Sequence, residues 1–100
     1  MARQLIWSPR ARRDLHDILD FIAKDSPVHA GSVARRMLAR AEALPEQPGQ
    51  GRRVPEYEGR DEIREVFVHS WRVIYRTTDE AITIVAIVHA ARLLTNTPPL

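Results

Sequence analysis

Apolar residues recur at helical spacing through the first half of the chain. Between Pro9 and Lys24 they fall at positions 11, 15, 18, 19 and 22, which predicts an amphipathic helix. A second helix is predicted from Pro27 to about Leu44. Its inner face comprises Ala30, Val33, Ala34, Met37, Leu38, Ala41 and Leu44. Ser-Pro precedes each helix, and serine is a favourable N-cap while proline is a favourable first helical residue. The short connection forces the two helices into an antiparallel hairpin.

Shorter apolar runs with β-forming residues predict four strands, one before the helices at residues 4–7 and three after them at residues 63–68, 71–77 and 82–89. Residues 45–55 are rich in proline and glycine and are expected to form an ordered loop. A strand followed by a helix hairpin returns the chain to the end where the strand finished, so the next strand is predicted to run antiparallel to the first. The predicted fold class is α+β, with βααβββ order and an antiparallel sheet. The helix hairpin packs on one sheet face, and the other face is partly open.

Length and composition restrict the possible functions. One hundred residues are enough for one domain, expected over residues 1–94 with a flexible tail over residues 95–100. No apolar run reaches transmembrane length, and the N-terminal residues lack a signal-peptide layout. Cysteine is also absent. We therefore expect a cytoplasmic protein that does not bind membranes. The four histidines lack metal-ligand spacing, so neither a metal nor another cofactor is expected.

Arginine dominates the cationic residues, because 14 of the 15 basic side chains are arginines. Guanidinium groups pair bidentately with carboxylates and phosphates. The predicted strands carry Arg64, Arg72 and Arg76, and Arg92 follows the last strand. Arginines repeated along a sheet indicate a rigid cationic surface that faces an anionic partner, although an arginine-rich host proteome explains part of the excess.

Five segments carry a resemblance to a known family. They are Trp7-Ser8-Pro9-Arg10-Ala11, Pro48-Gly49-Gln50-Gly51-Arg52, Ile63-Arg64-Glu65, Trp71-Arg72-Val73-Ile74-Tyr75 and Val88-His89-Ala90-Ala91-Arg92. In this order they resemble the RelE/ParE superfamily of toxins from bacterial type II toxin–antitoxin modules, with the ParE branch most similar, from Leu5 to about Leu94. Trp71 stands where members often have tyrosine, and the chain lacks the lysines that RelE-type ribonucleases tend to use.

The resemblance implies one of two activities. ParE toxins act on DNA gyrase, for which a binding surface suffices. RelE toxins are ribosome-dependent mRNA interferases, which need a general acid, a general base and cations around the reacting phosphate. For the ribonuclease, Arg64 and Arg72 would be the cations, and His89, or else His69, the acid or base. The lack of a convincing acid–base pair favours a ParE-like gyrase inhibitor, which is no enzyme, and an inactive binding module is the third hypothesis.

The resemblance also implies two sets of contact residues. Those for the target are Arg64, Trp71, Arg72, His89 and Arg92. A ParD-like antitoxin is expected to lay an amphipathic segment along the helix hairpin and to bring operator DNA to the complex. Its predicted contacts are Leu15, Leu19, Ile22, Met37, Arg40 and Arg76.

Structural roles are the alternatives for several of these residues. Trp71 and Tyr75 share strand parity with Val73 and can be partly core. Arg72 can pair with Glu65 or Asp61 instead of a partner. His89, the first candidate acid or base, can be a hydrogen-bonded residue at a strand end.

Overall fold

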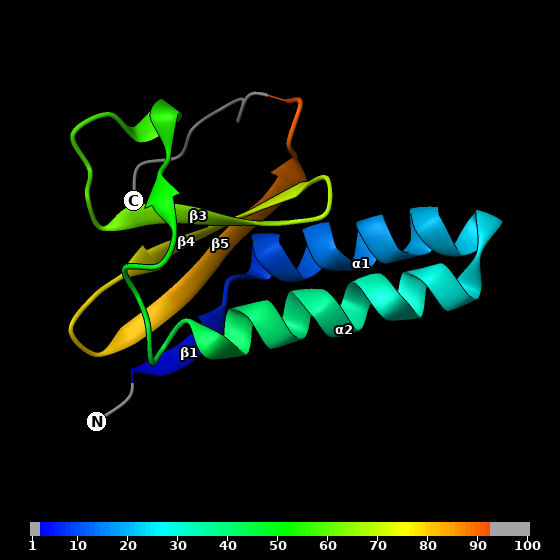
Figure 1. The fold of residues 1–100 in the computed structure, drawn as a ribbon, viewed down its shortest axis with the longest axis horizontal. Coiled ribbons are helices and arrows are strands. Elements are labelled where there is room, and N and C mark those ends of the chain that lie inside the picture. Colours follow the sequence, from blue (N-terminus) through cyan, green and yellow to red (C-terminus); the bar gives the residue numbers. More distant parts are fainter. Residues whose placement is uncertain (1–2, 93–100) are drawn as a thin grey trace.

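The computed structural model describes residues 3–92. Its elements are β1 (Gln4–Trp7), α1 (Pro9–Asp25), α2 (Pro27–Ala43), β2 (Arg52–Arg53), the 3-10 helix η1 (Pro55–Tyr57), β3 (Ile63–Val68), β4 (Trp71–Thr77) and β5 (Ala81–His89). The five strands form one sheet in the order β1-β5-β4-β3-β2, and the two helices cover one face of it (Figure 1). The α+β class and the helix hairpin are therefore confirmed. The predicted domain limit at residue 94 and the predicted tail lie outside the described residues.

Serine caps start both helices. The Ser8 hydroxyl accepts the Ala11 N–H at 3.0 Å, and the Ser26 hydroxyl accepts the His29 N–H at 3.1 Å. Ser26 also ends α1, because its own N–H donates to the carbonyl of Ile22 at 2.9 Å. Ser26 is the one residue between α1 and α2 and caps both of them, so the two helices are joined as a tight hairpin. Within residues 3–92, neither helix has the length and apolar content that crossing a lipid bilayer requires.

The sheet is mixed, which corrects the predicted antiparallel sheet. β1 pairs with β5 in parallel, whereas the β2–β3, β3–β4 and β4–β5 pairs are antiparallel. It follows that β3 runs in the same direction as β1. The reason is β2, which lies within the predicted loop. It is the first strand after the hairpin and does run antiparallel to β1, so the chain reverses once more before β3.

Apolar cores lie on both faces of the sheet. The larger core fills the space between the sheet and the helices and contains the fully buried Met37 and Tyr75. The smaller core contains Val54, Tyr57, Ile63 and Ile74. It forms because the segment after β2 folds back over the sheet, so this face is less open than the sequence predicts.

A β-bulge in β5 decides which of its side chains face the helices. The pairing with β4 skips Val85, so Ala86 pairs with Ile74 while Ile84 pairs with Tyr75. The extra residue reverses the alternation of side chains along the rest of β5. Residues 84 and 87 consequently both pack in the larger core.

Candidate functional site

A cleft of about 700 Å³ lies between α1 and the end of β5. Its walls are Arg10, Asp14, Asp17, Ile18 and Phe21 of α1, together with Trp71, Ile87, Val88, His89, Ala91 and Arg92. Three of the predicted target-binding residues, at positions 71, 89 and 92, are thus brought together here. Phe21, which is 67% exposed, was not predicted. It lies outside the buried face of α1. An aromatic residue at an exposed position of a helix is the sequence signal that could have identified it.

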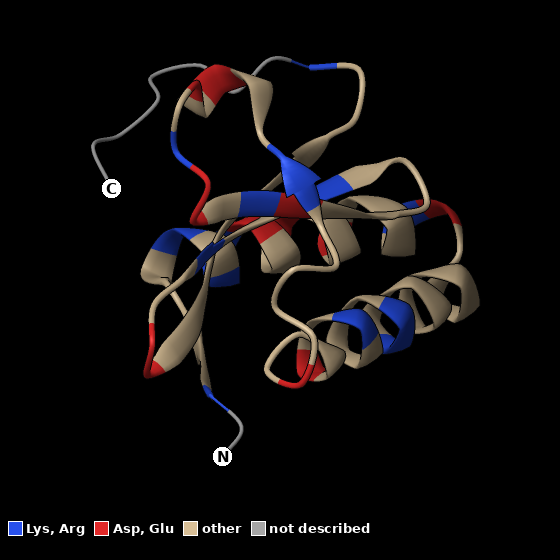
Figure 2. Ribbon diagram, turned by 60° about the vertical axis from the view of Figure 1, so that its left-hand side comes forward, with Lys and Arg blue, Asp and Glu red and all other residues tan. Residues whose placement is uncertain are grey.

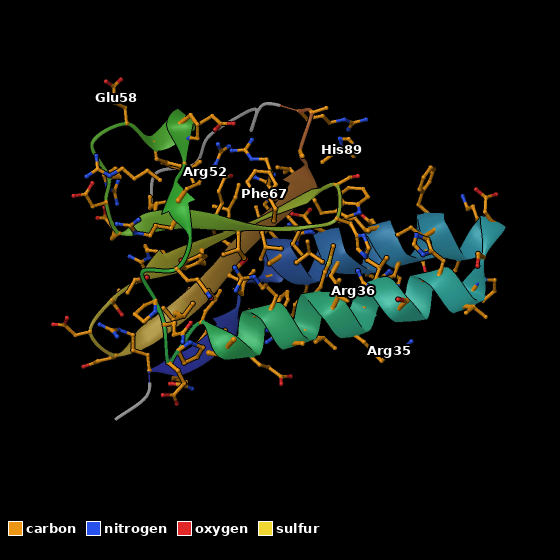
Figure 3. The ribbon with its side chains drawn as sticks, viewed as in Figure 1. Arg35, Arg36, Arg52, Glu58, Phe67 and His89 are labelled. Atoms are coloured by element: carbon orange, nitrogen blue, oxygen red, sulfur yellow. The ribbon has the colours of Figure 1, made fainter. Side chains whose placement is uncertain are left out.

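Trp71 and His89 line the cleft together. They are directly paired across β4 and β5, and their rings meet edge to face with centroids 5.3 Å apart. The Nδ1 atom of His89 accepts the Ala91 N–H at 3.1 Å, so a neutral imidazole carries its proton on Nε2. His89 is therefore a hydrogen-bonded strand-end histidine, as in the structural alternative, and Trp71 is partly buried against the larger core. Figure 3 shows His89 at this end of the sheet.

The start of α1 fixes the bulge that orients His89. The Ser8 hydroxyl donates to the carbonyl of the bulged Val85 at 3.1 Å. The Asp14 carboxylate accepts the Ile87 N–H at 2.9 Å, where β1 has already ended and no strand supplies an acceptor. On a regular strand, residues 84 and 89 would point to opposite faces. The bulge places His89 on the same face as Trp71, so the N-cap residue Ser8 and Asp14 of α1 help to build the cleft.

Arg72 points to the opposite face of the sheet and is only 4% exposed. Its Nε donates to Glu65 at 2.6 Å, its two terminal nitrogens donate to the two oxygens of Glu56 at 2.8 and 2.7 Å, and Nη1 also donates to the carbonyl of Arg92 at 3.0 Å. The hydrogen bonds to Glu56 and Glu65 raise the pKa of Arg72 further above its ordinary value, against the opposing effect of burial.

This environment confirms the ion pair of Arg72 with Glu65 and corrects the predicted placement of Arg72 on an open cationic surface. Glu65 is itself fully buried and also accepts from Nε of Arg52 at 2.6 Å. Asp61, the other predicted partner of Arg72, pairs with Arg53 at 2.9 Å instead. Both residues of β2 are arginines, and they pair with Glu65 and Arg64 of β3 (Figure 2). Several arginines at this edge of the sheet therefore neutralise the protein's own carboxylates.

Arg64 lies on the helix-facing side of the sheet, because it is paired with Tyr75. Its Nη1 donates to the carbonyl of Gly51 at 3.0 Å. His89 is on this face too, but at the other end of β4, and Arg72 is on the opposite face. His69, the second candidate acid or base, lies in the β3–β4 turn, 3.0 Å from Arg36. The candidate ribonuclease residues therefore do not converge on one point.

The residues predicted to contact an antitoxin differ in accessibility. Met37 is completely buried in the core, so its predicted place on a contact surface is wrong. Leu15, Leu19 and Ile22 are partly buried against the same core. Arg40 donates to the side chain of Gln50, and the arginine at position 76 is partly exposed. Their contact with a partner stays a prediction.

Comparison with known proteins identifies the family. Residues 5–94 match the family described as the ParE toxin of the type II toxin–antitoxin system parDE. The chain belongs to the ParE toxin family. It is also 37% identical over 91 residues to Toxin RelE2 of Caulobacter vibrioides, an alignment that spans 90% of this chain and 98% of that one.

Solved structures confirm the fold of this ParE-family chain. The chromosomal ParDE system of P. aeruginosa contains a chain with a TM-score of 0.71 at 20% identity, covering 88% of this chain and 96% of that one. A chain of the RelBE2 toxin–antitoxin complex of Mycobacterium tuberculosis gives a TM-score of 0.58 at 20% identity, covering 89% and 99%. Together with the family match and the 37% identical relative, this fold makes the protein a type II toxin of the ParE/RelE superfamily.

Proposed function

We propose that this toxin acts by binding DNA gyrase, as ParE toxins do, and not by cleaving mRNA. The proposal is carried by the separation of Arg64, Arg72 and His89. RNA cleavage needs an acid, a base and cations around one phosphate. Here Arg64 and Arg72 face opposite sides of the sheet, and the Arg72 guanidinium already binds two carboxylates and a carbonyl. An inhibitor needs no such convergence.

The proposed gyrase-binding surface is the cleft between α1 and β5. Aromatic and arginine side chains dominate the energetics of protein interfaces, and Phe21, Trp71, Arg92 and Arg10 provide both kinds around one depression. His89 also lines it.

A ParD-like antitoxin would neutralise the toxin through the helix hairpin, with Leu15, Leu19, Ile22 and Arg40 as its proposed contacts there, and would carry the complex to operator DNA. The remaining proposed contact, Arg76, lies on the sheet face opposite the helices, so the antitoxin would have to reach around the sheet to touch it.

A supercoiling assay tests this proposal. Purified toxin is expected to inhibit gyrase or to trap cleaved plasmid, and to leave mRNA on translating ribosomes intact. Phe21→Ala should weaken inhibition by at least about tenfold, since interface aromatics often cost 2 kcal/mol or more when truncated. Phe67→Ala is the matched control, because Phe67 is also exposed, at 44%, but lies over Arg52 on the opposite sheet face (Figure 3).

The opposite outcomes are equally clear. Cleavage of ribosome-bound mRNA without any effect on gyrase would overturn the proposal in favour of the ribonuclease. Equal loss of inhibition in the Phe21 and Phe67 variants would remove the cleft as the binding surface. Co-expression with a cognate antitoxin should abolish toxicity in cells, and unchanged toxicity would contradict the proposed neutralisation.

A further inference from the structure

The chain after β5 is held from both faces of the sheet by consecutive residues of β4. On the helix-facing side, the Trp71 ring meets His89, the last residue of β5. On the opposite side, Nη1 of Arg72 donates to the main-chain carbonyl of Arg92 at 3.0 Å. Arg92 is among the residues that line the cleft, so the Arg72 contact fixes the backbone of a cleft residue.

The segment itself has few other attachments among the described residues. Ala90, Ala91 and Arg92 are all exposed. The N–H of Ala90 donates to the Ser70 carbonyl at 2.6 Å, and the N–H of Arg92 donates to the His89 carbonyl at 3.0 Å. The second of these bonds is local to the turn and cannot set the turn's position relative to the sheet. The Arg72 bond supplies that link at position 92.

The Arg72 guanidinium is itself oriented with little freedom. Glu65 binds its Nε and has no exposed side-chain surface. Glu56, from η1, binds both terminal nitrogens as a bidentate pair, which fixes the plane of the fork. The second oxygen of Glu65 is occupied by Arg52 of β2. A lysine could reach one of these acceptors but could not make the four bonds at once.

We infer that Arg72, oriented by Glu56 and Glu65, is a positioning residue that anchors the segment after β5 and thereby holds Arg92 at the rim of the cleft. Arg72 acts through Arg92 and makes no contact with the target itself. The anchoring stands on the geometry alone, and only its consequence for toxicity rests on the proposed function.

Hydrogen exchange in the free toxin tests the anchoring directly. Arg72→Lys and the milder Glu56→Gln are expected to speed exchange of the Arg92 amide by about tenfold, because the turn closed by its bond to the His89 carbonyl opens more often when Arg72 holds the Arg92 carbonyl less firmly. Amides in the middle of β4 and β5 should keep their wild-type rates in Glu56→Gln. Glu58→Gln is the matched control, since Glu58 is an exposed residue of the same loop, and should behave as wild type. An unchanged Arg92 rate in both anchor variants would overturn the inference.

A double-mutant cycle tests the consequence for function. Glu56→Gln, Arg92→Ala and the double variant are compared for growth arrest, gyrase inhibition and antitoxin affinity. If Glu56 acts through Arg92, the double variant is no weaker than Arg92→Ala alone, and antitoxin affinity is unchanged. Additive losses, or a parallel loss of antitoxin affinity, would mean general destabilisation and would overturn the positioning role. Full toxicity of Arg92→Ala would refute the proposed cleft surface and the functional consequence of the anchor, while the exchange rates still decide whether the anchor exists.

Discussion

Gly51 is the position where adding one methyl group should damage the fold most clearly. A Cβ atom there would lie 2.6 Å from the Glu65 carbonyl oxygen and 2.6 Å from the Tyr75 hydroxyl. Neither neighbour can move away cheaply, because the first is main chain of β3 and the second belongs to a fully buried side chain. Gly51 also donates its N–H to the Tyr75 hydroxyl at 2.9 Å, and this hydroxyl donates to the Pro48 carbonyl at 2.8 Å.

The expected cost of Gly51→Ala follows from these contacts. Overpacking costs about 1–3 kcal/mol, and a buried polar group that loses its partner adds about 1–3 kcal/mol. A total of about 2–6 kcal/mol is a large part of the roughly 5–15 kcal/mol that stabilises a small domain. It corresponds to a fall in Tm of at least about 10 °C, measured by thermal and urea denaturation.

Gly49→Ala is the matched control for this experiment. No heavy atom lies within 4 Å of a Cβ at Gly49, so the substitution should be neutral or should stabilise by up to about 1 kcal/mol through the unfolded chain. Agreement of the unfolding free energies of Gly51→Ala and Gly49→Ala within about 0.5 kcal/mol, below the effects expected of buried contacts, would contradict this reasoning. The close approach of this loop to β3 would then not be what requires glycine at position 51.

Three further predictions concern stability. Ser8→Ala should lower the free energy of unfolding by about 2 kcal/mol, against about 1 kcal/mol for Ser26→Ala, in urea denaturation. The reason is that Ser8 caps α1 and also donates to the carbonyl of the bulged Val85. Equal losses would show that the bond to the bulge contributes nothing. Burial raises the pKa of Tyr75, so its proton is held more tightly in the folded state, and the associated stability is present below about pH 10 and lost as the pH rises through the folded pKa. Tyr75→Phe should therefore flatten the alkaline decline of stability, and parallel curves for the two proteins would contradict this. Met37→Ala should cost about 2–5 kcal/mol without lowering the antitoxin affinity of the folded toxin; a loss of affinity at unchanged Tm would restore its predicted contact role.

Local signals predict most of the regular elements closely. Ser-Pro caps and apolar spacing place the helices within one residue of their observed ends, and the strands Ile63–Val68 and Trp71–Thr77 have the predicted bounds. Parity also places Arg72 and Ile74 on the face opposite Val73, as observed. These properties depend on residues a few positions apart, which is the range over which helical and strand periodicity act.

The direction of β1 could not be predicted in this way. β2 has two residues, too few for any period, and it follows a glycine and precedes a Pro55 turn, so its sequence is that of a loop. Missing this one strand omits one chain reversal and inverts the predicted direction of β3 relative to β1. β2 is a strand only because it pairs with β3, and this pairing joins residues that are well separated along the chain.

The chemistry of the candidate site depends on distant contacts in the same way. Arg72 is followed by apolar and basic residues, and its own strand does not supply the carboxylates that neutralise it. Glu56 lies 16 residues before it, and the Arg92 carbonyl lies 20 residues after it. An arginine on a strand therefore indicates a carboxylate or phosphate nearby without telling whether that anion belongs to a partner or to the protein. Here the protein supplies it, so the proposed target contacts are the partly or fully exposed arginines and aromatics around the cleft, and not the buried Arg72.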